Sequence, residues 1–254
     1  MDLRGFAIEH GLRPDTWPLF ANPNVWGFFF EGLRETVAIA AVAAVLSFAV
    51  ALVFALGRLS RRWWLRWPSV FYIETIRALP VLLLIVYFGI KGTALFRPIF
   101  GPDFDLPRFW AGVLGLTMYT SAVLAEIIRA GVLSLPRGQT EASRALGLSQ
   151  LQAMRHVILP QALRLMVPAM MAQLTTVIKD TSLVGTIGVF ELLRQGRTIY
   201  TQFFNPIEVL TIVALIYFVI CFALSQASRR FELGRAPRAV RVAIRDIELR
   251  DQAA

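Results

Sequence analysis

Two long stretches without charged residues constrain the fold of this chain more than any other feature. Residues 37–56 contain one polar side chain, and residues 209–227 are also mostly apolar. A hydrocarbon layer about 30 Å thick needs roughly 20 helical residues, because each residue of a helix rises about 1.5 Å. Apolar residues make up 56% of the whole chain, which is more than a soluble domain usually carries. Each stretch is therefore predicted to cross a membrane as a helix.

Three further stretches are long and apolar enough to span, although each carries a few polar residues. They are residues 69–90, in which Pro80 is expected to kink the helix, residues 109–133 and residues 163–184. Residues 185–206 are too short and polar for another span, and we expect a short helix or a re-entrant piece there. The sequence thus predicts an all-α integral membrane protein with five transmembrane helices.

The basic residues are concentrated in alternate connections between these spans. The formal net charge is +9, which in a soluble protein would suggest a nucleic-acid partner. Short loops rich in arginine stay in the cytoplasm, so five spans place the N-terminus outside and the C-terminus inside, and no nucleic-acid partner is expected. The arginines concerned are Arg58, Arg61, Arg62 and Arg66 after the first span, Arg129, Arg137, Arg144, Arg155 and Arg164 after the third, and the seven from Arg229 to Arg250 after the fifth.

The same features divide the chain into three parts. Residues 1–31 show no cleavable signal peptide and are expected to form an external or interfacial segment rich in aromatic rings. Residues 32–228 form the five-helix transmembrane domain, and residues 229–254 a basic cytoplasmic tail. One cysteine, Cys221, and two histidines offer neither an internal disulfide nor metal-ligand spacing, so no metal site is expected.

The connection 134–161 is the most informative part of the chain, because a long ordered loop is more often functional than a short one. Residues 139–146 read as a short helix that Gly147 ends. Ser149 can cap a second helix, which is expected to break at Pro160. Two short helices joined at a glycine form a compact knob. The knob either docks into a groove on a partner or lies as an amphipathic hairpin on lipid headgroups.

This loop also carries a spaced pattern of small and apolar residues after one acid. The residues are Glu141, Ala142, Ser143, Gly147, Val157, Leu159 and Pro160. The pattern resembles the loop of permease subunits of bacterial ABC importers for polar amino acids, which reads Glu-Ala-Ala, three residues, Gly, nine residues, Ile, one residue and Leu-Pro. Ser143 replaces the second alanine and Val157 the isoleucine. Shorter matches within residues 32–230 are Gly32-Leu33 with Thr36, Arg77-Ala78-Leu79-Pro80, Tyr119 with Ala125-Glu126, Arg129-Ala130-Gly131, and Asp180-Thr181-Ser182-Leu183.

The resemblance implies a type I ABC importer permease-like bundle in the bacterial inner membrane. In such importers the loop is held by a separate cytoplasmic ATPase, so Glu141 and Gly147 are expected at the centre of that contact. The implied partners are the ATPase with its ATP-Mg, a second permease copy or related subunit, an extracytoplasmic solute-binding protein, the amino acid and membrane lipid. The chain has only two lysines, Lys91 and Lys179, and neither lies in a phosphate-binding loop. We therefore expect no bound cofactor and no enzymatic activity of its own.

A zwitterionic substrate needs polar partners within the membrane, where an unpaired charge is unfavourable. The candidates for the substrate pathway are Tyr119, Glu126, Gln173, Lys179 and Asp180. Each has a structural alternative: helix packing for the polar side chains, and charge pairs for the ionised ones. The expected pairs are Glu126 with Arg129, three residues apart on one helix face, and Glu74 with Arg77 near the cytoplasmic boundary.

Two functions remain open at this point. The docking-type loop favours a permease subunit that forms the translocation pathway of an ATP-driven importer for polar amino acids. The alternative is a stand-alone secondary transporter or channel for small polar solutes, for which polar, glycine-broken spans repeated in two halves would be typical.

Overall fold

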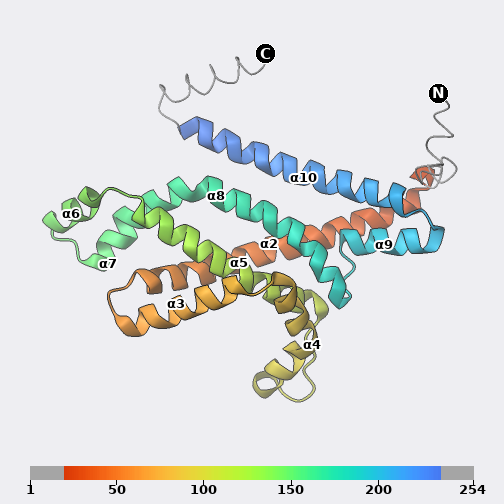
Figure 1. Cartoon of the computed structure of the whole chain (residues 1–254), viewed down its shortest axis with the longest axis horizontal. Coiled ribbons are helices and arrows are strands. Elements are labelled where there is room, and N and C mark those ends of the chain that lie inside the picture. Colours follow the sequence, from red (N-terminus) through yellow and green to blue (C-terminus); the bar gives the residue numbers. More distant parts are fainter. Residues whose placement is uncertain (1–19, 236–254) are drawn as a thin grey trace, which may run out of the picture.

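The computed structural model describes residues 20–235, with side chains as far as Arg230. Most of the expected segment 1–31 and most of the tail 229–254 lie outside this range. All regular elements between residues 20 and 235 are helices (Figure 1). They are α2 (Pro23–Leu59), α3 (Trp63–Ala78), α4 (Val81–Phe100), α5 (Arg108–Leu133), α6 (Arg137–Ala145), α7 (Gln150–Ala153), the π-helical turn η2 (Met154–Ile158), α8 (Leu159–Asp180), the 3-10 helix η3 (Thr181–Ile187), α9 (Leu192–Phe203) and α10 (Pro206–Arg235).

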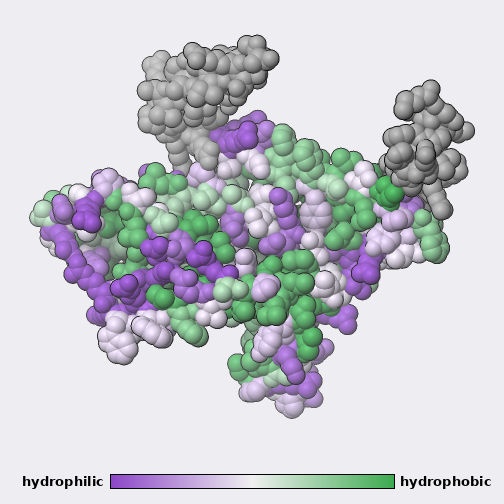
Figure 2. Space-filling model, viewed as in Figure 1, coloured by the Kyte–Doolittle hydropathy of each residue, from purple (hydrophilic) through white to green (hydrophobic). Residues whose placement is uncertain are grey.

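Five helical stretches are long and apolar enough to cross a membrane, as the sequence predicts. They are Pro23–Leu59, Val81–Phe100, Arg108–Leu133, Gln150–Ile187 and Pro206–Arg230. Apolar side chains cover the middle of the molecule, while hydrophilic ones gather at the end where α6 and α7 lie (Figure 2). Large apolar residues therefore face outward along the spans, where lipid rather than water is their favourable neighbour.

Helix α5 is the centre of the bundle. In its most apolar stretch 67% of the residues are buried, against 17% to 28% in the other four candidate spans. Helices α2, α3, α4 and α8 all pack on it (Figure 1). Small residues make this possible, since a Cβ added to Gly115 would lie 2.7 Å from the Cα of Ile85 in α4. Such close backbone approach is typical of helix pairs in membranes.

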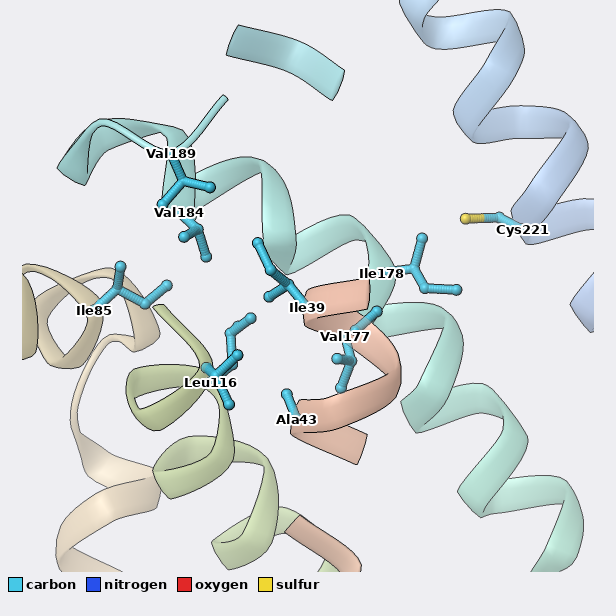
Figure 3. Packing of buried hydrophobic residues seen from close by; sticks show 11 residues of the cluster. Ile39, Ala43, Ile85, Leu116, Val177, Ile178, Val184, Val189 and Cys221 are labelled. Carbon is cyan, nitrogen blue, oxygen red and sulfur yellow. The ribbon is translucent and has the colours of Figure 1, made fainter. Parts of the chain in front are cut away.

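One apolar cluster joins all the main spans near the N-terminal half of α5. It brings together side chains of α2, α4, α5, α8, η3 and α10 (Figure 3). Its labelled members are Ile39, Ala43, Ile85, Leu116, Val177, Ile178, Val184, Val189 and Cys221. The Cys221 thiol is buried and unpaired, in the packing role expected for it.

The prediction that residues 69–90 form a single kinked helix is wrong. The chain forms α3 and α4 instead, separated at Leu79 and Pro80, both of which have extended backbone. Proline lacks the N–H that a continuous helix needs and disfavours helical backbone in the residue before it. Only α4, which runs ten residues past the expected end to Phe100, meets the length and hydropathy of a span.

The expected short helix in 185–206 is confirmed. It is α9, which follows η3 and a left-handed turn at Gly188. Thr36 Oγ1 of α2 accepts a hydrogen bond from Leu192 N at 3.1 Å, and a Cβ on Gly32 would lie 2.8 Å from Leu192 Cα. Helix α9 is therefore packed closely against the first span.

Candidate functional site

The helical knob, residues 134–161, is a defined structure at one end of the bundle (Figure 1). Its first helix, α6, ends where Gly147 adopts a left-handed φ of 79°. Gly147 N donates to Arg144 O at 2.9 Å and Leu148 N donates to Ser143 O at 3.1 Å. Most residues with a Cβ are strained in this conformation, so the backbone itself favours glycine here. The predicted stop at Gly147 is confirmed.

Ser149 begins the second helix of the knob, also as predicted. Its Oγ accepts from Gln152 N at 3.3 Å, while Ser149 N donates to Gln152 Oε1 at 2.9 Å. This reciprocal capping box satisfies two N–H groups that the start of a helix leaves without partners. The two short helices are therefore held by local hydrogen bonds rather than by distant packing alone.

The expectation that Pro160 breaks the second helix is wrong. Helix α7 continues through η2 into α8, so the knob leads without interruption into the fourth span. Proline lacks an N–H and clashes with the carbonyl four residues earlier in an α-helix. The wider π-helical turn from Met154 to Ile158 lies just before Pro160, and such turns relax the regular hydrogen-bond ladder. Motion of the knob can therefore pass directly to α8.

The pattern residues of the knob differ in exposure. Glu141, Ala142 and Gly147 are exposed, whereas Ser143 is buried and donates its hydroxyl to Gln139 O at 2.7 Å. Leu159 is half-buried and Pro160 exposed. Two leucines on either side of the glycine turn, Leu146 and Leu151, are 81% and 75% exposed. Exposed leucines on a polar, ordered knob are typical of a surface that another protein covers.

A network of charges joins three helices at the knob end of the spans. Glu126 accepts from Arg129 Nε at 3.0 Å, which confirms the predicted pair within α5. Arg58 of α2 joins it, with Nη1 at 3.2 Å from Glu126 and 2.8 Å from Glu74 of α3. The expected pair of Glu74 with Arg77 is therefore wrong, because Glu74 pairs with Arg58. Neutralising ion pairs allow these charges to lie close to the membrane core.

The other predicted pathway residues do not form one site with Glu126. Tyr119 packs with the cluster of Ile76 and Leu84, and Lys179 is exposed while its neighbour Asp180 is half-buried at the opposite end of α8. Adjacent helical residues point in different directions, which explains the difference between Lys179 and Asp180. The structure thus separates the five candidates along the length of the spans.

Gln173 lies instead in a hollow of about 340 Å³ between α2, α5 and α8. The walls are mainly apolar and include Phe48, Leu124 and Met170. Two buried polar atoms of lining residues, Gln173 Nε2 and Thr120 Oγ1, have no hydrogen-bond partner among the described residues. Buried polar atoms normally have partners, so the pair marks a place where a polar group of another molecule is favourable. The sequence did not single out Thr120.

Glu191 forms a second polar network at the opposite end of the bundle, which the sequence analysis missed. Its fully buried carboxylate accepts from Leu193 N at 2.9 Å, from Arg194 N at 2.7 Å and from the Tyr217 hydroxyl at 3.2 Å. Burial raises the pKa of Glu191, although these hydrogen bonds and Arg194 act in the opposite direction. An acid directly before the apolar pair Leu192-Leu193 is a helix-capping signal that could have located it.

A charged hollow of about 470 Å³ opens beside this network. Glu31, Arg34 and Glu35 of α2 line one side, and Arg108 at the start of α5 lines another. Both signs of charge are present within one open hollow. This end of the molecule can therefore bind positively or negatively charged groups of another molecule.

Comparisons with known proteins agree with this architecture. The family described as "Binding-protein-dependent transport system inner membrane component" matches residues 46–234. The glutamate transport system permease protein GluD of Corynebacterium glutamicum is 37% identical over 230 residues, which cover 89% of this chain and 83% of that protein. The probable glutamine ABC transporter permease protein GlnP of Bacillus subtilis is 37% identical over 211 residues, covering 81% of this chain and 93% of that one.

A solved structure shares the fold over most of its length. It is the crystal structure of an amino acid ABC transporter with histidines, with a TM-score of 0.72 and 33% sequence identity. The match covers 81% of this chain and 93% of that chain. The family match over residues 46–234 includes the helical knob.

Proposed function

Because the chain belongs to the family of binding-protein-dependent transport system inner membrane components, we propose that it is the membrane-spanning permease subunit of an ATP-driven importer for polar amino acids. The relatives at 37% identity carry glutamate or glutamine in their names. The spans form the translocation pathway in the membrane. A separate ATPase subunit binds ATP-Mg and supplies the energy.

The observation that carries this proposal is the rigid, exposed helical knob and its continuous path into α8. Leu146 and Leu151 project beside Gly147, so the knob offers an apolar surface for a partner. Glu141 is exposed on the same knob and can accept a charge-assisted hydrogen bond. Movement of the partner is transmitted through η2 to the fourth span.

The hollow with Thr120 and Gln173 supports a polar contact within the pathway. A zwitterion there finds the Thr120 hydroxyl and the Gln173 amide nitrogen, neither of which has a hydrogen-bond partner among the described residues, between mainly apolar walls. Glu126, Lys179, Asp180 and Tyr119 act at other depths.

The orientation in the proposal has the N-terminus outside and the C-terminus inside. Its support is the shared position of the arginine-rich connections: the turn between α2 and α3, the helical knob and the end of α10 lie at one end of the bundle (Figure 1). The charged hollow of Glu31 and Arg108 then faces outward, where an extracytoplasmic binding protein can reach it. A second copy or related permease completes the pathway.

Substitutions of two glycines in the knob test the coupling. No atom lies within 4 Å of a Cβ built on Gly147 or on Gly138 of α6, so both positions have room for a phenylalanine ring. At Gly147 the left-handed φ of 79° also strains the backbone of any residue with a Cβ, whereas Gly138 has no positive φ. Gly147→Phe is expected to release the ATPase or to uncouple hydrolysis from uptake by more than tenfold. The measurements are co-purification of the ATPase and amino acid uptake into proteoliposomes.

The controls separate bulk from backbone strain. Gly138→Phe adds the same bulk on α6, and Gly147→Asn keeps a residue that tolerates left-handed backbone. Both should retain most of the coupling. ATPase association and uptake that survive Gly147→Phe would show that the knob is not the coupling surface. Uptake that needs no ATPase at all would favour the stand-alone transporter.

A further inference from the structure

A third hollow lies where the helical knob meets the turn between α2 and α3. It has a volume of about 340 Å³ and is distinct from the exposed leucines of the knob. Three arginines line it from different segments: Arg61 follows α2, and Arg137 and Arg144 lie on α6. Figure 2 shows hydrophilic side chains over this end of the molecule. We call it the arginine-lined hollow.

The three guanidinium groups have no acidic partner among the side chains that the structure describes. No ion pair or side-chain hydrogen bond joins Arg61, Arg137 or Arg144 to a carboxylate within residues 20–230, whereas Arg58 and Arg129 nearby are both paired. The three exposed guanidinium groups make the hollow positively charged, so an anion that contacts more than one of them is favourable there. Guanidinium groups match phosphate oxygens in geometry as well as in charge.

The floor of the same hollow is apolar. Val132 and Leu135 lie at the end of α5 and after it, and Ile158 lies in η2 with 6% of its surface exposed. A small inorganic anion has no apolar part that could pack against these side chains. A ligand with an anionic head and an apolar part fits both surfaces.

Tryptophans next to Arg61 indicate the level of the membrane surface. Trp63, Trp64 and Trp67 at the start of α3 are 77%, 53% and 70% exposed. Tryptophan rings favour the headgroup region of a bilayer. Arg61 is two residues from the first of them, so the arginine-lined hollow lies at headgroup depth.

We propose that the arginine-lined hollow binds the phosphate of an anionic phospholipid, with Arg61, Arg137 and Arg144 around the headgroup and the apolar floor against the start of an acyl chain. A bound lipid would connect the α2–α3 turn to α6 and hold the knob at a fixed distance from the membrane. The proposal requires that the chain lies in a membrane, and it is independent of which solute is carried.

The test measures lipid binding to the full-length purified chain in detergent, without any ATPase, by native mass spectrometry. Phosphatidylglycerol and phosphatidylcholine are titrated in parallel, and inorganic phosphate is added separately. The wild type is expected to retain phosphatidylglycerol over phosphatidylcholine. The double variant R137Q/R144Q should bind phosphatidylglycerol about 25-fold more weakly, at about fivefold for each arginine lost near a membrane surface.

The matched control is R66Q/R155Q, which removes two exposed arginines that do not line the hollow. Because neither arginine lines the hollow, this variant should weaken phosphatidylglycerol binding clearly less than R137Q/R144Q does. Equal losses in both double variants, or equal binding of the two lipids, would overturn the proposal. If phosphate alone binds with the same dependence on Arg137 and Arg144, the ligand is a free anion and the lipid assignment is wrong. A separate co-purification with the ATPase distinguishes a protein ligand. If R137Q/R144Q binds lipid normally but no longer co-purifies with the ATPase, the hollow receives an acidic segment of that partner and the lipid assignment is wrong.

Discussion

Replacing Glu126 by glutamine should destabilise the bundle, because this carboxylate neutralises two arginines from different helices. Glu126 accepts from Arg129 Nε at 3.0 Å and lies 3.2 Å from Arg58 Nη1. Its side chain is 21% exposed, and that of Arg58 is 18% exposed. Glutamine keeps the size and one acceptor oxygen but removes the charge, so both arginines lose their common partner.

The size of the effect follows from this partial burial. Exposed ion pairs contribute about 0–1 kcal/mol, while removing one member of a fully buried pair costs about 3–5 kcal/mol. The burial of the Glu126 side chain is intermediate between these two cases, so we expect Glu126→Gln to lower the unfolding free energy by about 2 kcal/mol. In a chain of this length 1 kcal/mol shifts the Tm by about 2–4 °C, which gives a decrease of about 4–8 °C.

Glu74→Gln is the matched control, because Glu74 pairs with the same Arg58 at 2.8 Å but is 54% exposed. It should lower the Tm by about 2 °C or less. Tryptophan fluorescence during heating of the detergent-purified chain measures both variants. An unchanged Tm for Glu126→Gln, or a larger loss for Glu74→Gln, would refute the role of the network in stability. Normal Tm with lost uptake would place Glu126 in the substrate pathway instead.

Three further predictions follow from particular contacts. Gly115→Ala should cost about 1–3 kcal/mol of unfolding free energy, because the new Cβ would lie 2.7 Å from the backbone of Ile85. Gly138→Ala, which has open space around it, should leave the stability unchanged or increase it. Thermal denaturation measures both variants. Since the pKa of Glu191 is raised in the folded state, the wild type should lose stability relative to Glu191→Gln as pH rises through that pKa, measured as the difference in Tm. Gln173→Leu should raise the Tm of the isolated chain, because it removes a buried Nε2 that has no hydrogen-bond partner within residues 20–230, yet reduce uptake in proteoliposomes.

The features that sequence reasoning predicted correctly are local in the chain. The spans follow from the hydropathy of about 20 consecutive residues. Gly147 and Ser149 end and begin helices through contacts within five residues, and Glu126 pairs with Arg129 one turn away. Each of these depends on neighbours that the sequence itself places together.

The errors occurred at prolines, where two local structures compete. Pro80 was expected to kink a helix and instead separates α3 from α4, while Pro160 was expected to end a helix and instead follows a π-helical turn within a continuous one. A proline removes one hydrogen bond in every case. Whether the chain bends, breaks or widens a turn depends on what packs around it.

The sequence by itself determined that the chain crosses a membrane on five helices and carries a capped helical knob between the third and fourth, because hydropathy and capping act over short distances. Only the tertiary structure decided which polar groups meet. It joined Arg58 to Glu74 and Glu126 and enclosed Glu191 between α9 and Tyr217. It also placed Thr120 Oγ1 and Gln173 Nε2 in one hollow, where neither atom has a hydrogen-bond partner in the part of the chain that the structure describes. These contacts join residues that are far apart in the chain. Their energies depend on interatomic distances and on side-chain burial, and both are set only when the helices pack around α5.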